Sequence, residues 1–327
     1  MNKLYWCLLL IFVSGCSTLT KTQIAGVKQF AIASSKFSAY PSKIINGLGD
    51  IRMRRGVYYA NSLDNPKLHI EELDNIYNSR KEEALVSAKV DVTFRIIDKY
   101  AQSLLLLSSV EYEKSLRAQS DTFGTDLDSL TTLYNKLDNV KRVPTGIGSA
   151  IGQLIASGGG QFIRRKQARE IRKFVPAADT IVSVMTGNLL EFLQSSHIRE
   201  LIENEEAGIT SNYLSYLRQV KTESSMSSPA DTSFITLNTK SAISSDLDYL
   251  QMKANLDNVK KLQALTITAT SKLRAAHKKL LEVIRARQTL KTSIPEIQSL
   301  YDDIIKIKKA VDQIEKPRNT SYENTGS

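Results

Sequence analysis

Apolar residues recur every three or four positions along most of the chain. They do so in four regions, at about 22–61, 66–119, 162–220 and 239–315. This alternation is the period of an α-helix that buries one face against its neighbours. The pattern therefore predicts four helical regions.

The second region carries the longest predicted seam of apolar side chains. Because a helix rises 1.5 Å per residue, this region would form a rod of roughly 80 Å. The seam comprises Ile70, Leu73, Ile76, Leu85, Ala88, Val92, Ile96, Tyr100, Leu104 and Leu107.

Prolines, glycines and serines mark where these regions are expected to break. Pro41 is expected to kink or split the first region, since proline lacks the backbone N–H that a helix interior needs. Gly124 is expected to interrupt the second region, and Pro176 and Gly187 to divide the third. Ser293 fits the position of a helix cap, which predicts a break and a restart in the fourth region.

The segment 221–237 is polar and rich in serine, which predicts an exposed loop. The only brief candidate for a strand, "SFITLN" at 233–238, overlaps its end. Long helices with continuous seams must bury them against one another. We therefore expect an all-α fold, an elongated antiparallel helical bundle or a set of coiled-coil-like hairpins over 22–316. The polar tail, 317–327, is expected to be disordered.

The charge balance favours a basic surface. The 327 residues include 44 Lys and Arg against 34 Asp and Glu, a formal charge of +10. Such a surface suits anionic lipid headgroups or cell-wall polymers. It also suits a solvated helical surface with a surplus of lysine, and the composition does not separate the two.

The first sixteen residues, "MNKLYWCLLLIFVSGC", have the layout of a secretory signal. Lys3 is followed by ten apolar residues, too few to span a bilayer permanently. Val13-Ser14-Gly15-Cys16 then resembles the lipobox of bacterial lipoproteins. This resemblance implies removal of residues 1–15 and lipidation of Cys16, by a diacylglycerol joined to its sulfur and by an N-linked acyl chain such as palmitate. A lipidated tether at 16–21 would follow.

The same resemblance implies a location. Ser17, rather than Asp, after the lipidated cysteine implies the outer membrane, with the body of the protein in the periplasm or at the cell surface. Three acyl chains, at about 0.8 kcal/mol per buried CH₂, would make the anchor effectively permanent. Membrane lipid is thus one expected partner, and nucleic acid is not expected.

The stretch "VPTGIGSAIGQLIASGGGQFIRRK", 143–166, holds six glycines and no charge before Arg164. Gly148, Gly152, Ala156 and Gly160 recur every four residues, which on a helix makes a groove that another helix or a membrane could approach. One interpretation is a weakly apolar hairpin, 143–193, that enters a bilayer. The other is a hinge or a tightly packed turn.

A nucleotide-binding interpretation of the same glycines fails on context. Gly146, Gly148 and Gly152 approach a dinucleotide fingerprint, but that site needs a strand before the loop and a βαβ unit around it. A predicted helix precedes these glycines, so we expect no nucleotide here.

Candidate catalytic groups are few. The other cysteine, Cys7, lies in the signal, so the mature chain has no thiol available for a disulfide, a nucleophile or a metal. His69 and His277 lack a Glu three positions earlier, and so does His197, which shares a helix face with Glu200. The glutamates that follow, Glu203, Glu205 and Glu206, predict a solvated charged face. We expect no catalytic residues, metal or cofactor.

These features predict a lipid-anchored helical envelope protein with a structural or interaction role. Its seams would pack against an envelope protein or a second copy of the chain. The alternative is a membrane-active protein, forming a pore or inserting into a bilayer through the 143–193 hairpin. A third possibility, carriage of a lipid or other ligand inside the bundle, predicts a sizeable apolar cavity.

Overall fold

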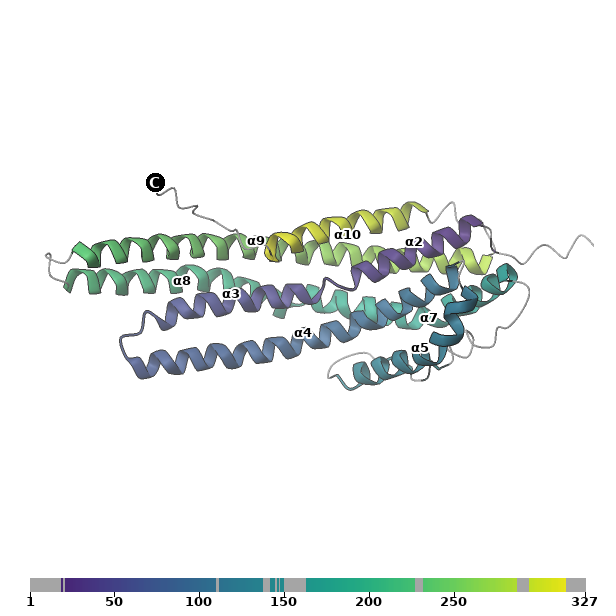
Figure 1. Cartoon of the computed structure of the whole chain (residues 1–327), viewed down its shortest axis with the longest axis horizontal. Helices are drawn as coiled ribbons and strands as arrows, with labels where there is room; N and C mark the ends of the chain where they lie inside the picture. Colours follow the sequence, from purple (N-terminus) through teal and green to yellow (C-terminus); the bar gives the residue numbers. More distant parts are fainter. Residues whose placement is uncertain are drawn as a thin grey trace, which may run out of the picture. The chain divides into compact units, whose positions relative to one another are not determined.

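The computed structural model describes residues 19, 21–109, 112–137, 142–144, 146, 148–149, 163–226, 232–286 and 294–315. Within these residues every regular element is an α-helix, and the chain is an all-α helical bundle, as the seams predicted (Figure 1). The helices are α2 (Lys21–Phe37), α3 (Ser42–Ala60), α4 (Pro66–Ser108), α5 (Tyr112–Asn135), α7 (Ile163–Gln194), α8 (Ser196–Met226), α9 (Thr232–Ala286) and α10 (Ile294–Glu315). The strand candidate at 233–238 is wrong, because it lies inside α9.

Two expected breaks and the expected start of the second region at residue 66 are confirmed. Pro41 separates α2 from α3. Pro66 opens α4, where proline needs no N–H partner, and the Asn65 side chain accepts a hydrogen bond from the Lys67 N–H at 2.9 Å. The fourth region is divided, since α9 ends at Ala286 and α10 begins at Ile294.

The break expected at Gly124 is wrong. Gly124 lies inside α5, and the helix before it ends at Ser108. The hydroxyls of Ser108 and Ser109 donate hydrogen bonds to the carbonyl oxygens of Leu105 and Leu106, both at 3.0 Å. Serine side chains that bond the local backbone compete with helical hydrogen bonding, and paired small residues of this kind often mark a helix kink.

The breaks expected at Pro176 and Gly187 are also wrong, because α7 continues through both. The neighbours of Pro176 are buried: Phe174, Val175 and Ala178. Their packing outweighs the local penalty of a proline, which is about 3 kcal/mol in a helix interior. The third region instead breaks at Ser195, whose hydroxyl oxygen accepts a hydrogen bond from the Ile198 N–H at 3.3 Å.

The expected loop at 221–237 is much too long. Helix α8 extends to Met226 and α9 begins at Thr232, so helix occupies both ends of that segment. The residues between the two helices lie outside the described part of the chain.

The chain divides into two compact units. Unit 1 comprises Met1–Lys36, Arg95–Met185 and Lys272–Leu300. Unit 2 comprises Phe37–Phe94, Thr186–Ser271 and Tyr301–Ser327. Each unit therefore draws on three separate stretches of the sequence.

An aromatic cluster fills the core of unit 1. The rings of Tyr100 and Phe174 stack with their centroids 5.4 Å apart. The Phe30 ring meets Tyr100 edge-on at 6.4 Å, and all three side chains are buried. Aromatic pairs in such geometries contribute about 0.5–1.5 kcal/mol beyond the area they bury.

Unit 1 also contains a side-chain link between α5 and the residues after it. The Asn135 amide donates a hydrogen bond to the Val143 carbonyl oxygen at 2.7 Å, and its oxygen accepts one from the Val143 N–H at 2.8 Å. One side chain thus satisfies both backbone groups of Val143, which is buried.

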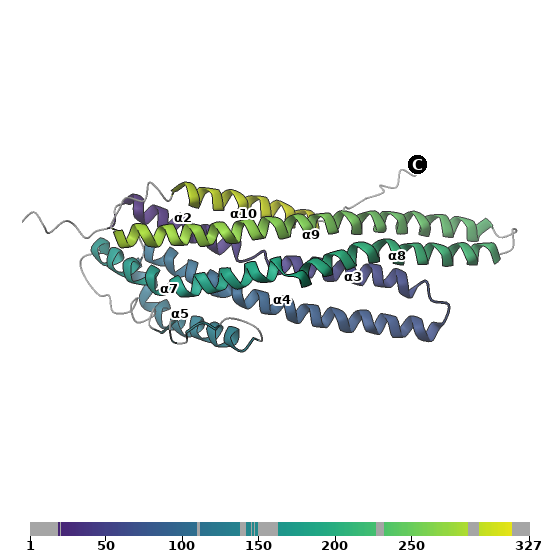
Figure 2. The same cartoon turned by 180° about the vertical axis from the view of Figure 1, so that it is seen from behind.

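Unit 2 is built around facing seams. Helix α3 packs against α8, and α8 lies beside α9 in both views (Figures 1 and 2). The seam of α3 contains Ile44, Leu48, Ile51 and Tyr58, and that of α8 contains Ile198, Ile202, Ile209 and Tyr213. Gly47 permits a close approach, because a Cβ there would lie 2.7 Å from Val259 Cγ2 of α9.

Candidate functional site

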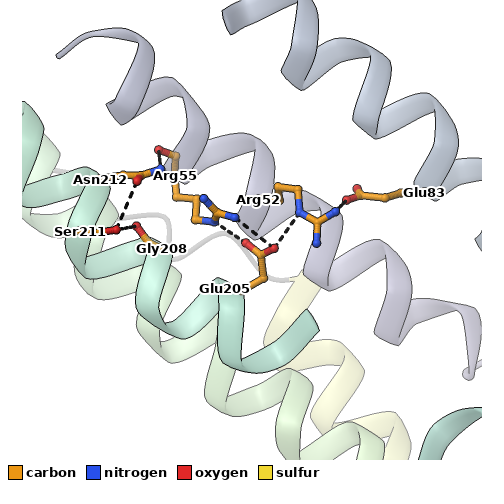
Figure 3. A network of polar contacts seen from close by, with 7 residues as sticks. All are labelled: Arg52, Arg55, Glu83, Glu205, Gly208, Ser211 and Asn212. Carbon is orange, nitrogen blue, oxygen red and sulfur yellow. Dashed lines mark hydrogen bonds and ion pairs between the residues drawn. The ribbon is translucent and has the colours of Figure 1, made fainter. Parts of the chain in front are cut away.

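A buried cluster of arginine and glutamate joins three helices of unit 2 (Figure 3). The carboxylate of Glu205, from α8, is fully buried. It accepts a hydrogen bond from Arg52 Nε at 2.7 Å and another from Arg55 Nε at 2.5 Å, both from α3. Two guanidinium groups therefore hold one carboxylate away from water, the arrangement that a buried charge requires.

The position of this cluster follows from the seams. Arg55 lies four residues after Ile51 and three before Tyr58, so it occupies a seam position of α3. Glu205 occupies the matching kind of position in α8, between Ile202 and Ile209. A charged pair at facing seam positions fixes the register of two helices, because other registers leave a charge buried without its partner.

A glycine makes room for the pair. Gly208 lies one turn after Glu205, and a Cβ there would come within 2.6 Å of the Arg55 guanidinium. Next to it, the Asn212 amide donates a hydrogen bond to the Arg55 carbonyl oxygen at 3.0 Å. The backbone and the side chain of Arg55 are thus both held by α8 (Figure 3).

The cluster extends to α4 through Glu83. Arg52 Nη1 lies 2.6 Å from Glu83 Oε1, and Arg80 Nη2 lies 2.6 Å from Asp50 Oδ1. Burial raises the pKa of Glu83, and the nearby charges of Arg52 and Arg80 oppose that rise. Carboxylates and guanidinium groups alternate through the cluster, so its charges are balanced.

A cavity of about 330 Å³ lies beside the cluster. Its lining includes Arg52 and Arg55, but both guanidinium groups already face carboxylates. The cavity therefore offers an anionic ligand little unmatched positive charge. Its lining is Arg52, Arg55, Gly56, Tyr59, Glu72, Asn75, Ile76, Ser79 and Asn212, a largely polar set unlike the apolar cavity that lipid carriage predicted.

Unit 1 buries a second polar group, His277 of α9. The Tyr100 hydroxyl and His277 Nδ1 are hydrogen-bonded at 3.1 Å, and Asp179 Oδ1 lies 3.3 Å from Nε2. Burial lowers the pKa of His277 to about 4, although Asp179 opposes the shift. The ring is therefore neutral at pH 7. Burial also raises the pKa of the Tyr100 hydroxyl well above its ordinary value, which suits a structural hydrogen bond rather than an acid or a nucleophile.

The first part of α4 leaves an apolar surface uncovered. We call Ile70, Leu73, Tyr77, Ala84 and Leu85 the α4 strip; all five are exposed. The exposed fractions are 61% for Ile70, 62% for Tyr77 and 65% for Leu85. Large apolar surfaces left outside a fold commonly mark interaction sites.

The α4 strip corrects the sequence-based expectation. Ile70, Leu73 and Leu85 belonged to the predicted buried seam of the second region, as did Ala88, and all four are exposed. The later part of that seam is buried as expected, at Ile96, Tyr100, Leu104 and Leu107. The same helix thus carries one seam whose beginning, apart from the half-buried Ile76, is exposed within the described chain.

The residues predicted to carry a site are only partly described. Cys16, Gly152, Ala156 and Gly160 lie outside the described residues. Gly148 is described, and a Cβ there would overlap the Gly124 carbonyl oxygen of α5. The Asp128 carboxylate accepts hydrogen bonds from the N–H groups of Gly148, at 2.7 Å, and Ser149, at 2.8 Å. This end of the glycine-rich stretch is packed against α5.

The second arm of the 143–193 hairpin is part of α7. Most of its apolar side chains are buried: Phe174, Val175, Ala178, Ile181, Val182, Val184, Met185, Leu189 and Leu193. Across the helices that the structure describes, none combines the length and the apolar character needed to cross a bilayer.

The glutamates after His197 do not form one solvated face. Glu206 is exposed and lies 2.8 Å from Lys260, but Glu205 beside it is fully buried. The signal for this was present, since Glu205 falls in the register of Ile198, Ile202 and Ile209. In the described parts of the chain, no three His, Cys, Asp or Glu side chains are grouped so as to hold a metal ion.

Comparisons with protein-family models, with curated proteins and with solved structures found no match to this chain.

Proposed function

We propose that this protein is a lipid-anchored helical envelope protein whose role is structural, through binding to a protein partner. The lipid on Cys16, at the end of the lipobox-like sequence, would hold the protein in the outer membrane. The helical body would then lie in the periplasm or at the cell surface. The observation that carries the interaction role is the α4 strip, an apolar helix face that no described residue of unit 2 covers.

The energetics favour a partner for this surface. Burying a Leu, Ile or similar side chain completely contributes about 1.5–3 kcal/mol. Ile70, Tyr77 and Leu85 each retain more than half of their exposure. A partner that covered them would therefore gain several kcal/mol of apolar burial, enough to support a specific contact once other groups match.

The buried polar groups support a scaffold rather than a catalyst. Glu205 lies between two arginines, and His277 lies between Tyr100 and Asp179. Groups held in this way fix the packing of helices and present no nucleophile to a substrate. We accordingly propose no enzymatic activity.

The anchor is tested by fractionating cells that express the chain with Cys16→Ala. We expect the parent in the detergent phase of the envelope fraction and the variant unprocessed or released in soluble form. A variant that is processed and retained as firmly as the parent would contradict the lipid anchor.

The interaction role is tested in the intact envelope with a photo-activated cross-linking residue. We expect a residue introduced at Tyr77 to give a discrete adduct of higher mass. The matched control is Leu133 of α5, which is 50% exposed and lies in unit 1, and there we expect none. Absence of any adduct at Tyr77 would contradict the interaction role.

The alternative is a membrane-active protein that inserts the 143–193 hairpin. Its support is the uncharged, glycine-rich sequence before Arg164, whereas the described second arm buries most of its apolar side chains in the bundle. Insertion would have to unpack those side chains. Liposome leakage by the parent, abolished by Gly152→Asp with Ile151→Asp, would favour this alternative over the interaction role.

A further inference from the structure

We propose that the α4 strip is covered by the α4 strip of a second copy of this chain, in an antiparallel pair about a two-fold axis near Tyr77. This inference rests on the proposed interaction role and names the partner. It follows from the spacing of the apolar residues and from the order of the charges beside them.

The spacing is that of a helix that pairs with another helix. Ile70, Tyr77 and Ala84 are seven residues apart, and Leu73 lies three after Ile70. Side chains at these positions line one face of a helix, as in the seam of a two-stranded coiled coil. All four are exposed, so the face is free for a second helix along three turns or more.

The charged residues beside the apolar side chains of the strip can form opposite-charge pairs between two copies only if the two helices are antiparallel. Asp74 and Lys81, also seven residues apart, lie around the helix between the row of Ile70, Tyr77 and Ala84 and the side chain of Leu85, and both are exposed. Asp74 and Lys81 are equally far from a point between Tyr77 and Asn78. A two-fold axis at that point therefore places Asp74 of each copy opposite Lys81 of the other, twice per pair.

The same axis brings apolar groups together. Ile70 lies opposite Leu85 of the second copy, and the two Tyr77 side chains meet near the axis. A parallel pair would place Asp74 against Asp74 and Lys81 against Lys81, which is repulsive. Two-fold pairs of one surface are the commonest oligomers because every favourable contact is made twice.

Lys81 is already held at the edge of the strip. Its ammonium nitrogen lies 4.3 Å from the centre of its own Tyr77 ring. A cation over an aromatic face is weakly stabilised there. The ammonium group is thus positioned beside the apolar face, where an acidic side chain of a second copy would meet it.

The small area of the α4 strip limits the affinity of the dimer. The α4 strip from Ile70 to Leu85 is about 24 Å long, and a helix face about 10 Å wide would bury about 240 Å² per copy. Stable interfaces bury about 800 Å² per partner, so the pair belongs to the weak, reversible class. A shared membrane surface would raise the effective concentration of two anchored copies and favour pairing there.

Charge reversal tests the pair on the full chain, purified in mild detergent. We expect the parent to dimerise reversibly by sedimentation velocity, with a dissociation constant in about the micromolar range. Asp74→Lys and Lys81→Glu should each weaken the dimer about tenfold, since each leaves two like-charge pairs across the axis. The double variant, Asp74→Lys with Lys81→Glu, should recover the parent affinity. It restores both opposite-charge pairs with the two signs exchanged.

Two further variants separate the surface from general instability. Ile70→Glu should weaken the dimer at least tenfold, whereas Leu133→Glu, equally polar but in unit 1, should leave the dissociation constant unchanged. Circular dichroism should show both variants as helical as the parent.

A chain that stays monomeric at every concentration would overturn the inference. So would a dimer that is indifferent to both charge reversals, or a double variant that fails to recover. A cross-link from Tyr77 to a different envelope protein, with a monomeric parent, would overturn the inference and leave the proposed interaction role intact. A cross-link from Tyr77 to this same chain would support both.

Discussion

The two units of this protein differ in the side chains that they bury and in those that they leave exposed. Unit 1 packs the rings of Phe30, Tyr100 and Phe174 around a neutral histidine. Unit 2 places a charged cluster at Glu205 in its core and leaves an apolar strip outside. Among the described residues, all the exposed large apolar side chains except Leu133 belong to unit 2.

Among the described residues, unit 1 thus leaves one large apolar side chain exposed, whereas unit 2 leaves the α4 strip exposed. The core of unit 1 contains uncharged rings, and a buried hydrogen bond joins Tyr100 to His277. A seam with one charged pair gains specificity, since only one register satisfies Arg55 and Glu205. The uncovered strip beside that seam gives unit 2 a further surface through which to bind.

The largest expected effect is the loss of the charge at the centre of unit 2. Glu205→Ala leaves Arg52 and Arg55 half-buried without their carboxylate, so we expect the free energy of unfolding to fall by about 4 kcal/mol. Glu206→Ala removes the neighbouring exposed ion pair and should lower it by less than about 1 kcal/mol. Urea denaturation of the two variants measures the contrast, and equal effects would mean that the cluster does not stabilise unit 2.

The next effect compares two leucines of the same helix. Leu104 of α4 is fully buried in unit 1, and Leu85 of α4 is largely exposed in unit 2. Leu104→Ala should lower the free energy of unfolding by about 3 kcal/mol, and Leu85→Ala by less than about 0.5 kcal/mol. Leu85→Ala must be measured at a concentration low enough for the protein to be monomeric, because pairing of the strip would add to the measured stability. A large loss for Leu85→Ala under those conditions would show that the strip is covered within one chain.

A smaller effect is the pH dependence of stability that comes from His277 in unit 1. The pKa of His277 is about 4 in the folded protein and about 6.5 when unfolded, so the unfolded state binds a proton that the folded state does not. Stability must therefore fall as the pH falls below about 6.5, by about 2 kcal/mol between pH 7 and pH 5 for this residue. His277→Gln should remove that part of the pH dependence. The measurement is the difference between parent and variant in urea at both pH values, and identical slopes would contradict it.

The smallest effect distinguishes two helical glycines of unit 2. Gly187 of α7 has open space where a Cβ would stand, whereas Gly47 of α3 touches Val259. Gly187→Ala should stabilise the protein by up to about 1 kcal/mol, because alanine is the better helix former. Gly47→Ala should destabilise it, since the methyl group needs Val259 to move. Thermal unfolding of both variants provides the comparison, and stabilisation by both would refute the close contact at Gly47.

The helical fold was predictable because its signals are local. The spacing of Ile96, Tyr100, Leu104 and Leu107 predicts a buried helix face even when the helices that pack against it are unknown. The breaks at Pro41 and before Ile294 also follow from residues close in sequence. The lipid anchor and the envelope location stay predictions, since Cys16 lies outside the described residues.

The errors arose where packing outweighed local preference. Pro176 and Gly187 are poor helix formers, yet α7 passes through both while Val175 and Ala178 stay buried beside them. Tertiary contacts decide such positions, and they are not visible in a window of a few residues.

The polar clusters were missed for a related reason. Arg55 and Glu205 are 150 positions apart, and each alone resembles a surface residue. Their seam positions were the available signal, but a charge in a seam becomes informative only when the opposing helix is known. For Tyr100 and His277, 177 positions apart, the sequence offered only a histidine among lysines and arginines.

The pairing of Asn135 with Val143 has a consequence for the lifetime of the protein. The side-chain amide donates to one backbone group of Val143 and accepts from the other. Spontaneous deamidation would replace the donating nitrogen by a carboxylate oxygen and bring two acceptors face to face. Chemical ageing at this one side chain would thus open the contact between α5 and the chain that follows it, without any change elsewhere in the molecule.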